Sequence, residues 1–309
     1  MISFVDAFKM ELFRAGLETT DPIIADGKLH RIHVVGDRKS TKNGWYILYP
    51  DHPATGVFGC WKRGIYVKWH ACNEKSLSVS DLRLFRERKR QAEAKIKSSF
   101  QDNLQLIKNN QYAWEYARRA RDDHPYLLKK KVYSHGLRQH NGALLVPIMD
   151  ADATVHGYQR IWPNGRKYFA KGSIISGHFY MLGDLLAPLI LVCEGYATAA
   201  SLHEITGFAV AVAFDCGNLR PVTEAIHKAW PSYQIVICAD DDLHSPNNPG
   251  VTSANEAANA VNARVILPVF PGDREPYDSD FNDLYLKFGR EAVLDCLLKE
   301  NIYVSTHKN

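Results

Sequence analysis

The stretch QIVICADDD, residues 234–242, decides the fold. Its run from Ile235 to Ala239 is apolar throughout and ends at three adjacent carboxylates, Asp240, Asp241 and Asp242. A short apolar run predicts a buried strand, whereas three like charges in a row repel one another and give a loop no structural benefit. The stretch therefore indicates a strand whose carboxyl end presents acids to a positively charged ligand.

Apolar runs alternate with helical patterns on both sides of this stretch. The runs PLILVCEG, FAVAVAF and RVILPVF resemble QIVIC, and helical patterns begin at Tyr196, Leu219 and Thr252. Such alternation, with strands apolar along their whole length, is typical of a parallel sheet that helices cover on both faces. We therefore predict an α/β domain with a parallel sheet and C-terminal helices over residues 187–309.

Three segments of different composition precede this domain. Residues 1–75 begin with a short amphipathic helix and continue with Gly-punctuated alternating stretches such as WYILY and IYVKW, which predict a small β module. Residues 76–135 are rich in good helix formers and predict a basic helical arm, which we expect His124-Pro125 to end. Residues 136–186 predict a strand-rich subdomain with an Asn164-Gly165 turn.

The net charge of +4 conceals an asymmetry along the chain. Residues 83–131 contain 14 Lys and Arg against 6 Asp and Glu, whereas residues 186–309 contain 8 against 16. A basic segment joined to an acidic one suits a polyanion bound by the first and metal ions bound by the second. Charge alone leaves open that both segments are merely solvated surfaces.

Acids follow several of the predicted strands. Glu194 ends the first apolar run, and strand alternation places Asp240 and Asp242 on one side and Asp241 on the other. A later loop adds three more acids: Asp278, Asp280 and Asp283. Because ligands of open α/β sheets collect at the carboxyl ends of strands, we expect Glu194, Asp240 and Asp242 to hold one or two Mg²⁺ ions.

Several other functions are excluded by the absence of their motifs. The sequence contains no G-x-x-x-x-G-K-[ST], G-x-G-x-x-G or H-E-x-x-H pattern, and GYATAAS is not a G-x-S-x-G elbow. The six cysteines form no C-x-x-C pair, so buried free thiols are expected. No apolar stretch approaches the roughly 20 residues that span a bilayer, and the N-terminus lacks a signal-peptide layout, so we expect a cytoplasmic protein without membrane association.

The segments CEGYATAAS, AFDCGN, ICADDD and DFNDL together resemble the TOPRIM fold family, a metal-binding module shared by bacterial-type primases, topoisomerases and certain nucleases. The resemblance spans about Leu189 to Leu298. It implies that Glu194, Asp240 and Asp242 are catalytic and that Asp280 or Asp283 stands in the family's third acidic region. It also implies four metal ligands: Glu194, Asp240, Asp242 and Asp280.

The segment before this domain is similar to the strand-rich subdomain of bacterial replicative primases. This similarity implies that Arg160, Lys167 and Lys171 bind nucleotide or template, and cations beside an acidic metal site suit phosphate groups. The stretches HPYL, VPI, EGYATA and DFND resemble most closely the TOPRIM primases of plasmids and prophages. One departure is Thr198, which stands where replicative primases carry an assisting acid.

The N-terminal module resembles a degenerate zinc ribbon. Its Cys60 and Cys72, with His52 and His70 nearby, do not supply four ligands at ribbon spacing, so no zinc is expected. Aromatic and basic side chains of this module could instead stack on and bind single-stranded DNA. The candidates are Trp45, Trp61, Lys62, Arg63 and Trp69.

The sequence thus predicts a DNA primase, a DNA-directed RNA polymerase that makes short RNA primers by metal-dependent nucleotidyl transfer in plasmid or phage-type replication. We expect Mg²⁺ or Mn²⁺ as cofactor, single-stranded DNA as template and ribonucleoside triphosphates as substrates, with a replicative helicase in trans as a candidate partner. A TOPRIM nuclease is one alternative. A non-catalytic DNA-binding TOPRIM protein is the other, and Thr198 favours it.

Overall fold

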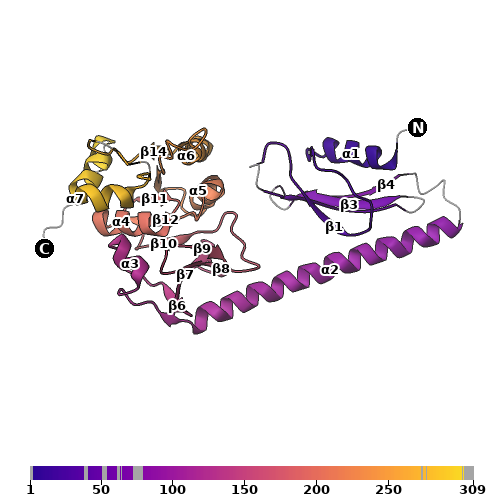
Figure 1. Cartoon of the computed structure of the whole chain (residues 1–309), viewed down its shortest axis with the longest axis horizontal. Coiled ribbons are helices and arrows are strands. Elements are labelled where there is room, and N and C mark those ends of the chain that lie inside the picture. Colours follow the sequence, from indigo (N-terminus) through magenta and orange to yellow (C-terminus); the bar gives the residue numbers. More distant parts are fainter. Residues whose placement is uncertain are drawn as a thin grey trace. The chain divides into compact units, whose positions relative to one another are not determined.

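The computed structural model describes residues 3–37, 41–50, 54–60, 63, 65–71, 79–272, 274–275, 277–300 and 302. The chain divides into two compact units, Met1–Asp102 and Asn103–Asn309 (Figure 1). Trp61, Lys62 and Cys72, which figured in the sequence predictions, lie outside the described residues. Within the described part, no helix has both the length and the apolar character needed to cross a membrane.

The first unit contains the predicted β module. Four antiparallel strands pair in sequence order: β1 (Leu29–Ile32), β2 (Gly44–Tyr49), β3 (Thr55–Cys60) and β4 (Ile65–His70). Helix α1 (Phe4–Arg14) begins at Ser3, whose hydroxyl accepts a hydrogen bond from the Asp6 backbone at 3.1 Å. The Phe8 side chain is fully buried and packs edge-on against Tyr46 and Phe58, so α1 covers one face of the sheet.

The helical arm ends earlier than predicted. Helix α2 (Val79–Tyr116) is followed by the short strand β5 (Arg118–Arg119) and by helix α3 (Pro125–Lys130). His124-Pro125 begins α3 instead of ending the arm, because the His124 Nδ1 accepts a hydrogen bond from the Tyr126 backbone at 3.3 Å. Proline is well suited to the first turn of a helix, where its missing N–H costs nothing.

The second unit begins with the predicted strand-rich region. Five antiparallel strands lie in the order β5-β6-β7-β8-β9. The strands after β5 are β6 (Arg138–His140), β7 (Ala143–Met149), β8 (Val155–Ile161) and β9 (Lys167–Phe169). The predicted Asn164-Gly165 turn joins β8 to β9, with Gly165 at φ +85° and its N–H bonded to the Trp162 carbonyl at 2.8 Å.

The predicted parallel sheet forms the rest of the second unit. Its strand order is β10-β12-β11-β13-β14, and every pairing except that of β10 is parallel. The strands are β10 (Tyr180–Leu182), β11 (Leu189–Cys193), β12 (Ala209–Val212), β13 (Gln234–Cys238) and β14 (Arg264–Ile266). The sheet therefore starts before the predicted boundary at residue 187, since β10 pairs with β12 as its antiparallel edge.

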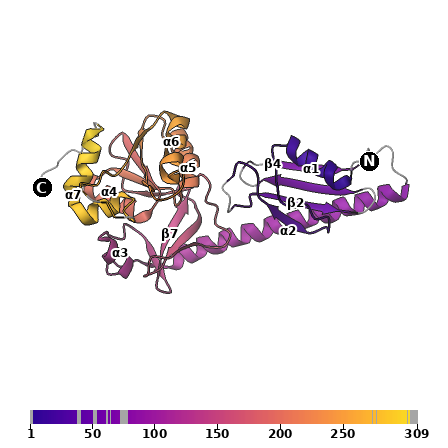
Figure 2. The same cartoon turned by 45° about the horizontal axis from the view of Figure 1, so that its top comes forward.

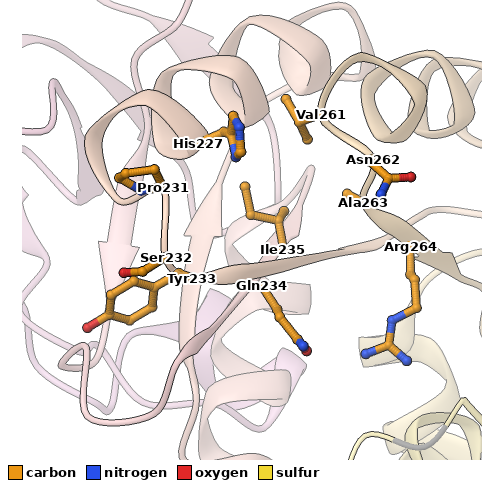
Figure 3. A pocket seen from close by; sticks show the side chains of 10 residues that line it. All are labelled: His227, Pro231, Ser232, Tyr233, Gln234, Ile235, Val261, Asn262, Ala263 and Arg264. Carbon is orange, nitrogen blue, oxygen red and sulfur yellow. The ribbon is translucent and has the colours of Figure 1, made fainter.

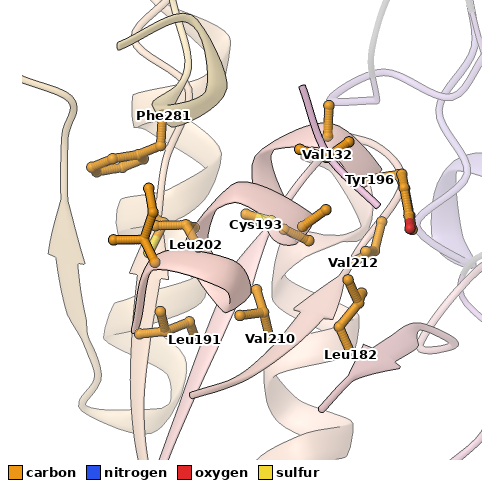
Figure 4. Close-up of a cluster of buried hydrophobic side chains, with 14 of the residues drawn as sticks. Val132, Leu182, Leu191, Cys193, Tyr196, Leu202, Val210, Val212 and Phe281 are labelled. Atoms are coloured by element: carbon orange, nitrogen blue, oxygen red, sulfur yellow. The ribbon is translucent and has the colours of Figure 1, made fainter. Parts of the chain in front are cut away.

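Helices cover both faces of this sheet, as predicted (Figures 1 and 2). They are α4 (Tyr196–Thr206), α5 (Leu219–Ala229), α6 (Pro249–Val261) and α7 (Phe281–Lys299). Leu191 and Cys193 of β11 face α4 and α7, where Leu202 and Phe281 are buried with them (Figure 4). The alternate β11 residues face the other side, where they are buried with residues of α5 and α6. The apolar strands of the sequence are thus explained by burial on both faces.

Candidate metal centre

The site begins where two neighbouring parallel strands end. Val192 of β11 pairs with Ile237 of β13, and the chain continues from these strands to Glu194 and Asp240. After β11 the chain enters α4 on one face of the sheet, and after β13 it enters α6 on the other. In α/β proteins, ligands bind where the chain changes face in this way, at the carboxyl ends of the strands.

Asp240 is the acid at these strand ends on which several neighbouring charges act. Its Oδ1 is buried and accepts no hydrogen bond from the described residues. Burial raises the pKa of Asp240 well above its ordinary value, and the charges of Glu194, Asp280 and Asp242 raise it further. The Lys167 charge acts in the opposite direction. The other three acids that the resemblance nominated as metal ligands are therefore close enough to act on Asp240.

This donor set fits a hard divalent cation. All four side chains offer carboxylate oxygens, which Mg²⁺ and Mn²⁺ prefer, and a cation would relieve the repulsion around Asp240. Among the described residues, no group of three or more His, Cys, Asp or Glu side chains is placed so that it could hold a metal ion. Mg²⁺ does not require such a group, because it usually keeps several waters and binds phosphate oxygens together with one or two carboxylates.

A network around Asn248 holds the loop after β13. The Asn248 side chain accepts a hydrogen bond from the Asp242 backbone at 2.9 Å and donates one to the Asp241 carboxylate at 2.7 Å. Gly250, in the first turn of α6, lies so close that an added Cβ would be 2.3 Å from the Asp240 carbonyl oxygen. The predicted helix start at Thr252 is therefore three residues late, because Asn248 and Pro249 already begin α6.

Asp241 has a partner of its own. Its side chain was predicted to face away from those of Asp240 and Asp242. It forms an ion pair with Arg274, and both side chains are more than four-fifths buried. The Asp241 backbone also donates a hydrogen bond to the Ser279 carbonyl at 2.8 Å. These contacts fasten the loop before Asp280 to the end of β13.

The three acids of that loop have different surroundings. Asp278 forms an ion pair with Lys287 at 2.7 Å, and Asp283 forms one with Lys130 at 3.2 Å. Asp280 is the N-cap of α7 and accepts a hydrogen bond from the Asp283 backbone at 2.8 Å. Burial raises the pKa of Asp280, and the Asp283 charge adds to this. Asp280 is thus the loop acid whose charge acts on Asp240.

The predicted phosphate-binding cations differ in their relation to the acids. Lys167, at the start of β9, lowers the pKa of Asp240 and Asp280 by its charge, although burial and the neighbouring acids outweigh it. Arg160 lies 5.0 Å from the Tyr158 ring centre and donates a hydrogen bond to the Tyr158 hydroxyl at 2.9 Å. Lys171 is exposed, and its carbonyl accepts a hydrogen bond from Asn110 at 3.1 Å.

Two features of the site depend on tertiary structure that sequence patterns do not carry. Lys130 reaches Asp283 across 153 positions of sequence, and no local signal could have indicated this pair. Thr198, which replaces the assisting acid, is buried in the first turn of α4. The structure therefore adds a cation to the site and leaves the Thr198 position neutral.

Two aromatic candidates of the N-terminal module, Trp45 and Trp69, pack within it. Trp45 is only 5% exposed and is buried with Ile47, Tyr49 and Val57, so its ring faces cannot stack on a base. The Trp69 ring packs edge-on against Phe8 at 5.2 Å. Arg63 remains exposed at the surface, although it donates a hydrogen bond to the Gly16 carbonyl. The described part of this module thus corrects the stacking prediction for Trp45.

A separate hollow lies at the opposite end of the parallel strands (Figure 3). Its lining includes Gln234 and Arg264, which begin β13 and β14, together with His227 and Asn262. These residues are at the amino ends of the strands and lie away from the carboxylates. The hollow is therefore not part of the acidic site.

The fold and the acids at its strand ends can be compared with known proteins. Residues 189–291 match the family described as Toprim domain. Over 274 residues the chain is 36% identical to a DNA primase TraC of Escherichia coli, covering 81% of this chain and 25% of that protein. A second Escherichia coli DNA primase TraC is 33% identical over 287 residues, covering 87% of this chain and 19% of that protein.

The chain thus spans about a quarter or less of the curated relatives it matches. Among solved structures, the primase fragment of the bacteriophage T7 primase-helicase protein is similar to it with 15% identity and a TM-score of 0.42. That match covers 55% of this chain and 73% of the T7 fragment. The resemblance to TOPRIM-domain primases inferred from the sequence is confirmed by the domain match and the TraC relatives.

Proposed function

We propose that this chain is the catalytic part of a DNA primase, which synthesises short RNA primers on single-stranded DNA with Mg²⁺ or Mn²⁺. The observation that carries the proposal is that Glu194 and Asp240 follow the paired strands β11 and β13, where the charges of Asp242, Asp280 and Lys167 also act on Asp240. Similarity to DNA primases TraC along most of the chain supports it. Single-stranded DNA and ribonucleoside triphosphates are the proposed ligands, and a replicative helicase is the proposed partner.

The proposed reaction joins two nucleotides. The 3′-hydroxyl oxygen of one attacks the α-phosphorus of the next triphosphate, a phosphodiester bond forms, and pyrophosphate leaves. A bound divalent ion would neutralise the charge on the phosphates. Asp240 and Asp242 would hold that ion, Glu194 would help to hold it or accept the hydroxyl proton, and Lys167 would bind the phosphates by its charge.

Dinucleotide synthesis tests this proposal. We expect Glu194→Gln and Asp242→Asn to abolish synthesis of labelled dinucleotide on single-stranded templates while the variants still bind DNA. Asp184→Asn, which changes an exposed acid of the same unit, is the matched control and should retain synthesis. Wild-type activity in either site variant would contradict the assignment of these carboxylates.

The same assay separates the alternative functions. A nuclease would shorten the labelled DNA, whereas a primase would give new products that depend on nucleoside triphosphates. The neutral Thr198 favours the alternative of a non-catalytic DNA-binding protein, which would give neither product on any template. Replacement of Thr198 by Asp tests whether an acid at this position raises the rate of synthesis.

A further inference from the structure

A second hollow lies where α2 ends and the first sheet of the second unit begins. It has a volume of about 520 Å³, and its lining includes Tyr116, Arg118, Arg119 and His140. Arg118 and Arg119 form the edge strand β5, and both side chains are exposed. Neither forms an ion pair within the described part of the chain, so their charges remain available to an anion.

Two exposed aromatic rings belong to this surface: Tyr116 lines the hollow with the arginines, and Tyr112 packs against Tyr116. Tyr112 is 62% exposed and Tyr116 is 68% exposed, and their ring centres are 4.2 Å apart. A spacing of four residues places both rings on one face of α2. Large aromatic surface left in water is unfavourable, and adjacent exposed tyrosines beside arginines are typical of binding surfaces. The pair therefore offers a stacking platform next to the cations.

Rigid contacts hold this platform in place. The Arg138 guanidinium donates hydrogen bonds to the carbonyls of Glu115 at 2.8 Å and Ala117 at 2.9 Å, which are at the end of α2. The same guanidinium lies 5.2 Å from the Trp114 ring centre. The Arg138 side chain thus stabilises the end of α2 and is not available to a ligand. Arg118 and Arg119 form no such contacts within the described residues.

We propose that this surface is a binding site for single-stranded nucleic acid, distinct from the metal centre. Bases would stack on Tyr112 and Tyr116, and phosphates would bind Arg118 and Arg119. Aromatic platforms beside a positively charged groove bind single strands with little sequence preference, because every base has a stacking face. A duplex hides its bases from such a platform, so the site should prefer single strands.

The position of the site indicates how a strand could reach the metal centre. β5 and β9 are the two edges of the five-stranded sheet, and Lys167 begins β9. Four strand spacings separate these edges, or about 19 Å. The site would therefore hold a strand several nucleotides away from the reacting groups. Whether the bound strand is template or primer depends on the proposed function. The binding of a single strand at this site does not depend on it.

Anisotropy of labelled oligonucleotides bound to the full-length chain tests this proposal. The probes are fluorescein-labelled oligothymidylate DNA, oligouridylate RNA and a duplex of equal length. We expect Tyr112→Ala with Tyr116→Ala to weaken single-strand binding at least about fivefold. The double Phe variant at these positions should bind normally, because it keeps both rings. Tyr133→Ala, which removes a ring that is 60% exposed elsewhere in the unit, is the matched control.

Removal of the arginines should change the salt dependence of binding, which removal of the tyrosines should not. Arg118→Ala with Arg119→Ala should weaken binding and reduce the slope of log affinity against log salt by about 1.4, the value for two lost phosphate contacts on a single strand. The tyrosine variants should leave that slope unchanged. Tighter binding of the DNA probe would assign the template to the site, and tighter binding of the RNA probe would assign the primer.

Several results would overturn the proposal. Wild-type affinity in both double variants would do so, as would an equal loss in Tyr133→Ala. Duplex binding as tight as single-strand binding, with no loss in the double Ala variant, would exclude stacking. Thermal melting of each variant identifies a folding defect, and the double Phe variant then decides the role of the rings. If the wild type makes no primer but binds strands in the expected pattern, the proposed function fails and this site stands.

Discussion

The surroundings of Asp240 disfavour the charged form of its carboxyl group. Burial and the charges of Glu194, Asp280 and Asp242 raise its pKa, and its Oδ1 accepts no hydrogen bond from the described residues. Such strain is common at functional sites, where a ligand rather than the protein supplies the missing interaction. In this chain the missing interaction suits a divalent cation.

Asp240→Asn should therefore stabilise the metal-free protein and remove its response to metal. At pH 7.5 the amide relieves repulsion among the four acids, so the free energy of unfolding without metal should rise. With Mg²⁺ at about 100 times its Kd, the wild type should gain about 2.7 kcal/mol, whereas the variant should gain almost nothing. Thermal melting with Mg²⁺ or EDTA measures both effects. Asp184→Asn should behave like the wild type, and a variant that still responds fully to Mg²⁺ would contradict the role of Asp240.

Arg274→Ala should destabilise the loop that carries Asp280. The change leaves the largely buried Asp241 carboxylate without its ion pair, and hydrogen bonds to charged groups contribute about 1.5 to 3 kcal/mol. Urea denaturation measures the loss. Arg220→Ala is the control, because its pair with Glu224 is exposed and should contribute less than about 0.5 kcal/mol. Equal effects of the two substitutions would show that Asp241 does not anchor this loop.

The sequence indicated the acids but not their partners. Glu194 and Asp240 could be found because each follows an apolar strand, and strand ends are recognisable from local patterns. Arg274 and Lys130 could not be found, because the contacts they make depend on how distant loops pack. That Asp280 caps α7 while Asp283 pairs with Lys130 likewise depends on how α7 packs.

At the scale of elements, α6 packs against the end of β13 through a glycine. Gly250→Ala should force these elements apart, because the new Cβ would be 2.3 Å from the Asp240 carbonyl oxygen and 3.2 Å from the Asp242 Oδ2. We expect a loss of about 1 to 3 kcal/mol in stability, together with weaker Mg²⁺ binding by calorimetry. Glu256→Ala, at an exposed position of the same helix, should change neither quantity. Unchanged Mg²⁺ affinity in the glycine variant would argue against this contact setting the geometry of the site.

Two histidines lie near the junction of the two sheets of the second unit. Met149 and Phe179 form an antiparallel bridge between these sheets, and the rings of His156 and His178 are 4.2 Å apart beside it. His156 also pairs with Asp150 at 2.8 Å. Burial lowers the pKa of His178 below its ordinary value of 6.5, and the His156 charge lowers it further.

Acid should therefore weaken this junction. The unfolded chain takes up a proton on His178 at a higher pH than the folded chain does, so stability present above pH 6.5 is lost as the pH falls toward the lowered pKa. The drop in Tm between pH 7.5 and 5.5 should be smaller in His178→Gln than in the wild type. His227→Gln, at an exposed position, should keep the full drop. An identical drop in all three proteins would refute the assignment to His178.

The strands that the sequence did not assign correctly are the short ones. β5 has two residues and lies inside the predicted helical arm, whereas β10 has three and joins a sheet that was expected to start later. Short strands carry too few residues to establish an alternating pattern, so only their partners define them. The longer strands β7 and β11 were predictable because their apolar residues extend over five positions or more, and β13 because its apolar run continues to Ala239.

At the scale of the whole molecule, the residues of the proposed metal centre all belong to the second unit. That unit also contains the last turns of α2, which are fastened to the first of its sheets. Asn110 and Gln111 donate hydrogen bonds to the carbonyls of Lys171 at 3.1 Å and Val155 at 2.8 Å. Gly172 lies close against Leu106, since a Cβ there would be 2.5 Å from the Leu106 Cβ.

Residues 103–309 should therefore fold alone and retain the response to metal. We expect a single cooperative melting transition, the same rise in Tm with Mg²⁺ as in the full-length chain, and retained dinucleotide synthesis. A shorter fragment, 117–309, should lose at least about 2 kcal/mol of stability, because it lacks the hydrogen bonds from Asn110 and Gln111 and also the Leu106, Trp114 and Glu115 contacts with the sheet. The longer fragment with Asp240→Asn should melt cooperatively without responding to Mg²⁺. Non-cooperative melting of 103–309, with the full-length chain intact, would mean that the second unit requires the first in order to fold.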